Sequence, residues 1–341
     1  MQNSLTRRSF MRTSVIAGAG LSIAGIGSSS EISTSPGQGT RVGIIGLDTS
    51  HCIAFTKALN DPKAGPEFGG YKVVAAYPTA GSSDLPASID RVADITEQVR
   101  QEGVRIVNSI DELLLKVDVV LLTTVDGRKH LEQSVPVIKA GKRMFIDKPI
   151  AATLADTIAI FDTAKKYNVP LFSSSSLRYI AGAKEVLEGK IGLVVGADTY
   201  GPAKFEKTHP DLFWYGIHGI EALFAVMGIG CKSVVRVNTN DTDMVVGTWK
   251  DGRIGSYRGT RSGKGNFGGI VFGEKGDLVL GEYNGYNRLL EKIIEFFRTG
   301  IVPVVAEETL EIVAFMEAAD ESKIKGGVPV DLQTIMERAK K

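Results

Sequence analysis

The chain has 341 residues, 43% of them hydrophobic, with 40 basic and 39 acidic side chains and a net charge of +1. This composition predicts a globular protein large enough for two domains, and the lack of any run of like charge argues against nucleic acid or a membrane surface as partner. We therefore expect a small-molecule ligand. Cys52 and Cys231 are the only cysteines, too few for a disulfide framework or a cysteine metal site.

The first thirty residues are predicted to be a targeting segment outside the fold. Paired arginines, Arg7 and Arg8, precede Phe10 and a short apolar run that glycines interrupt, which does not suit a membrane span. This pattern resembles a twin-arginine export signal. It implies export of an already folded protein to the periplasm or another extracytoplasmic space, without membrane insertion of the mature form.

Short apolar runs alternate with helical patterns from Arg41 to about residue 176. The apolar runs are continuous, which is typical of parallel strands covered on both faces. We therefore predict a doubly wound, Rossmann-type parallel sheet (α/β) over residues 39–176. The expected strands cover 41–47, 71–77, 105–109, 117–124, 143–149 and 169–175.

The pattern changes after Arg178 to long strand-like runs between a few helices. The Asp251-Gly252 pair between two such runs is a strong hairpin signal. Residues 177–341 are predicted to form an α+β domain with an open, mostly antiparallel sheet that serves substrate binding and oligomerisation. Because open sheets commonly pack against another copy, we expect a homodimer or homotetramer.

Segments along nearly the whole mature chain resemble the glucose–fructose oxidoreductase/inositol dehydrogenase (Gfo/Idh/MocA) family. The segments that carry the resemblance are the strand and glycine turn at 42–46, TTVDGRKHLEQSVPVIKAGKRMFIDKPIA at 123–151, Arg178-Tyr179, the helix with His218, FGEKGDL and EAADES. The resemblance implies an oxidoreductase that moves a hydride between a sugar or glycoside hydroxyl carbon and NAD or NADP. Because free NAD(P)H is not replenished outside the cytoplasm, tight cofactor binding is expected.

The turn GIIGLDTSH departs from the usual glycine pattern of a dinucleotide site. Gly43 and Gly46 are expected to let backbone amides approach a pyrophosphate, but Asp48 and His51 stand where further glycines are usual. We expect the Asp48 side chain to turn inward and cap the following helix. No carboxylate ends the second strand at Tyr77, so the choice between NAD and NADP stays open.

The expected cofactor-binding residues gather at the carboxyl edge of the predicted sheet. They are Gly43, Gly46, Asp48, Thr49, Ser50, His51, Ser82, Thr123, Thr124, His130, Asp147 and Lys148. His51 and His130 are expected to support the nucleotide or its loops rather than to catalyse.

Lys148 and His218 are the expected catalytic pair. Lys148 lies in Asp147-Lys148-Pro149, where the family usually has Glu-Lys-Pro, and a lysine at this edge can bind a substrate oxygen and shuttle a proton. His218 matches the family's catalytic histidine, and the near-neutral pKa of histidine suits a general acid or base. The carboxylate that the family places four residues earlier is Trp214 here, so Tyr215 is the expected substitute.

Substrate binding is predicted for residues at the start of the second domain and around His218: Arg178, Tyr179, His209, Asp211 and Trp214. His218 and Glu221 have the i, i+3 spacing of metal ligands on a helix, but without a further matched pair no metal is expected. Two other functions remain open. One is a redox-neutral enzyme that oxidises, eliminates and reduces to cleave a glycoside. The other is a non-catalytic carbohydrate-binding protein.

Overall fold

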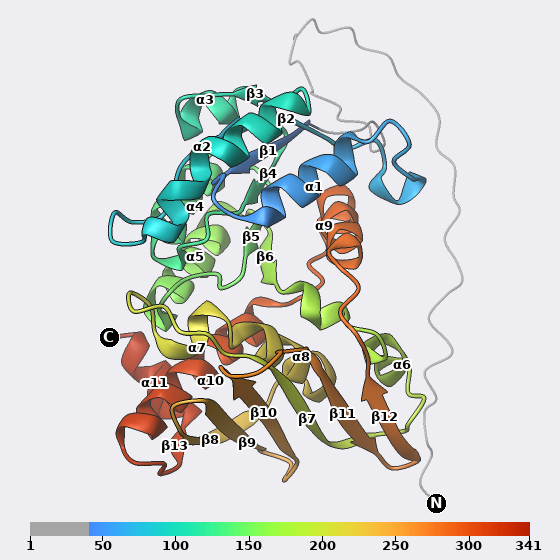
Figure 1. Ribbon diagram of the computed structural model, residues 1–341, viewed down its shortest axis with the longest axis vertical. Helices are drawn as coiled ribbons and strands as arrows, with labels where there is room; N and C mark the ends of the chain where they lie inside the picture. Colours follow the sequence, from blue (N-terminus) through green and yellow to red (C-terminus); the bar gives the residue numbers. More distant parts are fainter. Residues whose placement is uncertain (1–40) are drawn as a thin grey trace, which may run out of the picture. The chain divides into compact units, whose positions relative to one another are not determined.

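The computed structural model describes residues 41–341, which fall within one compact unit (Figure 1). The predicted export signal, residues 1–30, lies outside the described residues. No helix in the described part is both long and apolar enough to cross a membrane.

Six parallel strands form the first sheet, in the order β3-β2-β1-β4-β5-β6. The strands are β1 (Arg41–Ile45), β2 (Lys72–Tyr77), β3 (Arg105–Ile106), β4 (Val119–Leu122), β5 (Met144–Asp147) and β6 (Leu171–Ser174). The helices and 3-10 turns between them are α1 (Ser50–Asn60), η1 (Pro66–Phe68), α2 (Pro86–Gln101), α3 (Ile110–Leu114), η2 (Gly127–Lys129), α4 (His130–Lys139) and α5 (Leu154–Tyr167). The strand order reverses between β1 and β4, so ligands are expected at the carboxyl ends of these strands.

Local sequence explains how these elements begin and where they lie. Every residue of β4 and β5 is buried, as the continuous apolar runs predict for strands covered on both faces. The side chains of Ser109 and Thr153 accept hydrogen bonds from the backbone amides of the third residue of α3 and of α5, which caps both helices.

Seven strands form the second sheet, in the order β12-β11-β7-β10-β9-β8-β13, with only β7 and β10 parallel. Its strands are β7 (Val194–Pro202), β8 (Cys231–Asn238), β9 (Thr242–Trp249), β10 (Ile254–Thr260), β11 (Gly268–Gly273), β12 (Gly276–Leu280) and β13 (Val330–Asp331). The accompanying helices and 3-10 turn are η3 (Ser176–Tyr179), α6 (Ala183–Leu187), α7 (Asp211–Trp214), α8 (Ile217–Met227), α10 (Ala306–Ile324) and α11 (Leu332–Ala339). The predicted fold class is thereby confirmed, and the hairpin predicted at Asp251-Gly252 joins β9 to β10.

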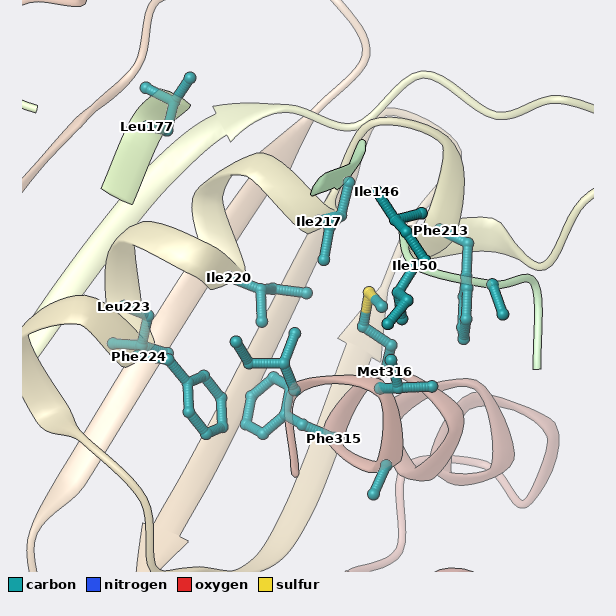
Figure 2. Close-up of a cluster of buried hydrophobic side chains, with 14 of the residues drawn as sticks. Ile146, Ile150, Leu177, Phe213, Ile217, Ile220, Leu223, Phe224, Phe315 and Met316 are labelled. Atoms are coloured by element: carbon teal, nitrogen blue, oxygen red, sulfur yellow. The ribbon is translucent and has the colours of Figure 1, made fainter. Parts of the chain in front are cut away.

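Helices α8 and α10 cover one face of the second sheet. Ten of the eleven residues of α8 are buried, and all but His218 and Glu221 are apolar, as expected for a helix buried between a sheet and another helix. Figure 2 shows Ile220 and Phe224 of α8 pointing toward Phe315 and Met316 of α10. The rings of Phe224 and Phe315 meet edge to face with their centroids 5.5 Å apart.

Helix α9 (Asn287–Thr299) returns from the second sheet to the first. Its apolar residues, among them Ile293 and Phe296, pack in one buried cluster with Phe55 of α1 and Phe172 of β6. Figure 1 shows α9 beside α1, although more than 200 residues separate them in the sequence. The segment predicted as the second domain therefore supplies one helix to the core of the first sheet.

The face of the second sheet that α8 and α10 leave open carries large apolar side chains. Tyr200, Val237, Ile254 and Val279 are each at least 45% exposed. The strand register places Tyr200 and Val237 in one row across the sheet, through Arg258 and Met244. Exposed apolar patches of this kind mark interaction surfaces.

Candidate active site

The glycine turn after β1 depends on Gly46 alone. Gly46 has a φ of 92°, and a Cβ atom there would lie 2.4 Å from the backbone nitrogen of Thr124, so only glycine fits. Gly43 lies inside β1, where a Cβ atom would meet the side chains of Val117 and Leu113. The expectation that Gly43 approaches a nucleotide is therefore corrected: it is small because helix α3 packs closely on the sheet.

Asp48 turns inward, as expected, but it does not cap α1. Its carboxylate accepts hydrogen bonds from the backbone N–H of Val125 (3.0 Å) and from the hydroxyl of Ser88 (2.6 Å). Burial raises the pKa of Asp48 to about 6. The N-cap of α1 is Thr49, whose side chain makes no capping hydrogen bond, and the first turn, from Ser50 on, holds no acidic residue. The amides at this helix N-terminus are thus left for another acceptor.

Hydrogen bonds join the loop that follows β2 to the loop that follows β4. The backbone N–H of Ser82 donates to Asp126 (2.9 Å), and Arg128 binds Asp84 through two hydrogen bonds of 2.9 and 2.7 Å. Burial alone would raise the pKa of Asp126, but hydrogen bonds from His209 and Arg128 hold it well below its usual range. His209 is buried against Asp126, with 3.1 Å between Nε2 and Oδ1, so its expected role in substrate binding is corrected to a structural one.

Three residues expected at the cofactor instead shape the loop after β4. The Thr123 hydroxyl donates to the carbonyl of Gly46 (2.8 Å), and the Thr124 hydroxyl donates to Gln133 (2.8 Å). His130 is fully buried and contacts the carbonyl of Thr124 through Nε2 at 2.7 Å. These side chains hold the loop through contacts within the protein, which matches the loop-supporting role expected for His130.

Asp147, Lys148 and His51 meet at the carboxyl end of β5. The Asp147 carboxylate lies 2.6 Å from Nδ1 of His51 and accepts a hydrogen bond from the backbone N–H of Lys148 (2.9 Å). Burial would raise the pKa of Asp147, but the charges of His51 and Lys148 hold it well below its usual range. The ammonium of Lys148 is half-buried and has no hydrogen-bond or ion-pair partner among the described residues. It is therefore available to a ligand.

His218, on α8, lies near this group. Its Nδ1 is 2.7 Å from the hydroxyl of Ser175, at the end of β6. Burial, followed by the charges of Lys148 and His51, holds the pKa of His218 well below its ordinary value. The near-neutral pKa expected from histidine in general is therefore corrected, and His218 is neutral at physiological pH. Tyr215 lies edge to face with it, with ring centroids 5.8 Å apart.

A series of aromatic rings runs from His51 to His218 and was not predicted from the sequence. Tyr286 lies 4.5 Å from His51 between ring centroids, and Tyr283 is 5.9 Å from Tyr286. Phe267 continues the chain at 6.4 Å from Tyr283 and 5.7 Å from His218. Burial raises the pKa of Tyr283. The two tyrosines lie in the segment GEYNGYN between β12 and α9, where aromatic residues flanked by glycine could have signalled a binding loop.

Two of the residues predicted to bind substrate form ion pairs within the protein. Arg178 forms a buried ion pair with Glu221 (2.9 Å) and a second with Glu308. Asp211 pairs with Arg236 at 2.9 Å and with Lys323.

Tyr179 packs against the cluster that contains α9, and Trp214 lies against His209 with ring centroids 5.0 Å apart. The predicted roles of these residues in substrate binding are not supported, because their side chains contact other groups of the protein. Within residues 41–341, no group of three His, Cys, Asp or Glu side chains could hold a metal ion.

Residues 40–175 match the family described as "Oxidoreductase family, NAD-binding Rossmann fold", GFO_IDH_MocA. This part of the chain is similar to that family's NAD-binding domain. The match covers the whole first sheet, the glycine turn and Lys148.

Two curated relatives match parts of the chain. An uncharacterised oxidoreductase of Streptococcus pneumoniae serotype 4 is 33% identical over 131 residues, which are 36% of this chain and 34% of the relative. The 1,5-anhydro-D-fructose reductase of Ensifer adhaerens is 32% identical over 100 residues, 28% of this chain and 30% of the relative. The chain thus spans about a third of the length of each of these relatives.

Solved structures share the fold over most of the chain. Scyllo-inositol dehydrogenase from Lactobacillus casei, with bound NAD(H) and scyllo-inositol, aligns with a TM-score of 0.68 and 18% identity over 87% of this chain and all of its own. A probable dehydrogenase from Thermotoga maritima aligns with a TM-score of 0.70 and 20% identity over 86% of this chain and 99% of its own. At these identities the likeness concerns the fold alone.

The glycine turn after β1 fits a dinucleotide in spite of Asp48. The carboxylate accepts hydrogen bonds from Val125 and Ser88 on the inner side of the turn, which satisfies its oxygens within the protein. The N-terminus of α1 has no side-chain cap and no acidic residue in its first turn, which is the usual cradle for a pyrophosphate. Thr49 and Ser50 begin this helix and are the residues we expect to contact it.

Proposed function

We propose that the protein transfers a hydride between a hydroxyl-bearing carbon of a sugar or cyclic polyol and a tightly held NAD or NADP. The observation that carries this proposal is the unpartnered ammonium of Lys148, close to neutral His218 at the carboxyl edge of the NAD-binding sheet. The names of the relatives, an anhydrofructose reductase and a scyllo-inositol dehydrogenase, support a carbohydrate-like substrate.

Each group in the site has a distinct task in this proposal. Lys148 and the Nε2 side of His218 bind the oxygen at the reacting carbon. Phe267, Tyr283 and Tyr286 supply an aromatic wall against which the apolar face of a sugar ring can stack, and the hydroxyls of the two tyrosines can bind its substituents. When bound, the nicotinamide nucleotide supplies the hydride or accepts it.

Tight cofactor binding is supported by the loops around the turn. Asp48 and Asp126 tie the loops after β1, β2 and β4 to one another through buried hydrogen bonds. A nucleotide held beneath such tied loops leaves slowly, because several hydrogen bonds must break together for the loops to part.

The experiment that tests this function begins with the purified protein, denatured and analysed for released nucleotide by mass spectrometry. We expect close to one NAD(H) or NADP(H) per chain, and reduction of the bound nucleotide when cyclic polyols or glycosides are added. A keto product supports the dehydrogenase, whereas a cleaved glycoside without net redox change supports the redox-neutral alternative. A protein without nucleotide that also fails to bind added NAD(H) and NADP(H) would rule out both.

We also propose that the open face of the second sheet pairs with another copy of the chain. Replacing Val237 and Tyr200 with glutamate places charge among exposed apolar side chains, so the mass measured by analytical ultracentrifugation is expected to fall from that of a dimer or tetramer to that of a monomer. Glutamate at Leu115, 82% exposed but on the first sheet's side of the molecule, is the matched control. A wild-type protein that sediments as a monomer contradicts the proposal.

Export by the twin-arginine route is proposed from the sequence pattern at Arg7 and Arg8. Replacing both arginines with lysine keeps the charge but removes the guanidinium pair. We expect the variant to stay in the cytoplasm of a bacterial host, while the wild type is recovered outside it, as measured by cell fractionation and immunoblotting. Equal distribution of the two proteins would exclude this route.

A further inference from the structure

Ser175 holds His218 in a defined orientation at the edge of the site. Ser175 follows β6, is 1% exposed, and its Oγ lies 2.7 Å from Nδ1 of His218. The same oxygen accepts the backbone N–H of Leu177 (3.1 Å), which fixes the serine as the N-cap of η3. Among the described residues, Nδ1 of His218 is the only acceptor that the Ser175 hydroxyl reaches.

The position of the hydroxyl hydrogen decides which ring nitrogen of His218 carries a proton. A serine hydroxyl has one hydrogen to donate and lone pairs to accept, and the Leu177 amide already uses one lone pair. If Nδ1 were protonated, the buried hydroxyl hydrogen would have no acceptor, which is costly in a buried site. Hence Ser175 donates to Nδ1, and the single proton of the neutral imidazole is on Nε2.

The other side of the ring faces the ligand space. Nε2 of His218 has no partner among the described residues and is not among the buried unpaired atoms, so it is accessible. We propose that Ser175 makes His218 a hydrogen-bond donor to the substrate oxygen, and that Lys148 carries the proton. This inference rests on the proposed oxidoreductase function and changes the acid–base role expected for His218.

The proton balance follows directly. In the reducing direction the carbonyl carbon gains a hydride from the reduced nicotinamide nucleotide, and the oxygen takes a proton from the Lys148 ammonium. One N–H bond breaks and one O–H bond forms, which leaves a neutral amine. His218 keeps its proton and polarises the carbonyl throughout, as a neutral imidazole can. In the oxidising direction the neutral amine of Lys148 takes the proton of the hydroxyl group.

Nitrogen NMR of protein labelled in its histidine rings tests the first half of this inference. The chain has only four histidines, and the His218 signals are assigned by their loss in His218→Gln. We expect Nδ1 unprotonated and Nε2 protonated in the wild type. Ser175→Asp still accepts from Leu177 but cannot donate, so the proton should move to Nδ1, whereas Ser175→Thr should keep the wild-type pattern.

Thr208→Val is the matched control, because the Thr208 hydroxyl contacts Nδ1 of His209 at 2.9 Å and should affect only that ring. A wild-type spectrum with Nδ1 of His218 protonated overturns the inference, as does a Ser175→Asp spectrum without change. Neither readout needs cofactor or turnover, so it is separate from the nucleotide test of the proposed function.

The second half is tested by turnover of His218→Gln. Glutamine keeps an N–H donor but cannot act as a base at neutral pH, so we expect kcat/KM to fall no more than about tenfold, the scale of one altered hydrogen bond. His218→Leu removes the donor and should lose far more. A loss of about 10²- to 10⁴-fold in His218→Gln, the range for removing a general acid or base, overturns the assignment of the proton to Lys148.

Discussion

Replacing Lys148 with methionine is expected to lower kcat/KM by about 10²- to 10⁴-fold, the usual contribution of a positioned acid or base. Methionine keeps the length and apolar stem of the side chain but removes its only hydrogen-bonding and proton-carrying group. The ammonium has no partner among the described residues, so its loss leaves no buried carboxylate without an ion pair there. Folding should therefore be little affected.

The loss is measured as steady-state kinetics with a polyol or glycoside that reduces the bound nucleotide of the wild type. The nucleotide content of Lys148→Met, measured after denaturation, should equal that of the wild type, which separates the chemical defect from loss of cofactor. Lys139→Met, on the exposed end of α4, is the matched control and should retain full activity. Activity within threefold of the wild type in fully loaded Lys148→Met would exclude the lysine from the chemistry.

Replacing Arg236 with methionine is expected to lower the free energy of unfolding by about 3–5 kcal/mol, the cost of breaking a buried ion pair. The guanidinium is fully buried and pairs with Asp211 (2.9 Å), Asp243 (2.8 Å) and Asp320. Without it, three carboxylates lie close together with less compensating charge. Urea unfolding followed by circular dichroism measures the difference.

The matched control is Arg288→Met on α9, whose side chain is 74% exposed beside Glu291. Exposed pairs of this kind contribute about 0–1 kcal/mol, so this variant should unfold at nearly the wild-type urea concentration. Equal stability of the two variants would show that Asp211, Asp243 and Asp320 find other partners when Arg236 is lost.

The sequence was sufficient for the fold class because the signals for it are local. Continuous apolar runs, a glycine turn and Asp251-Gly252 each act over a few residues, and the predicted strands formed in order, although the strand expected at 105–109 covers only Arg105–Ile106. The proximity of His51, Lys148 and His218 was also foreseeable in part. Carboxyl ends of neighbouring parallel strands share one edge, so His51 after β1 and Lys148 after β5 were expected there.

The errors concern side chains whose partners lie far away in the sequence. The sequence suggested that Arg178 and Asp211 were available to bind substrate. In the structure Glu308 of α10 pairs with Arg178, and Arg236 of β8 pairs with Asp211. The tyrosines 283 and 286 were missed because their place depends on the return of α9 to the first sheet. No local pattern reports a contact made across 25 residues or more.

The return of α9 means that the polypeptide crosses between the two sheets three times, after β6, through residues 281–286 and through residues 300–305. Three covalent connections restrict how far the two parts of the protein can move apart, and Tyr283 and Tyr286 lie on one of these connections. The first sheet is also not separable by a simple truncation. A fragment that ended at residue 176 would expose the apolar surfaces of Phe55, Phe145 and Phe172, and would need α9 supplied as a separate peptide or by circular permutation.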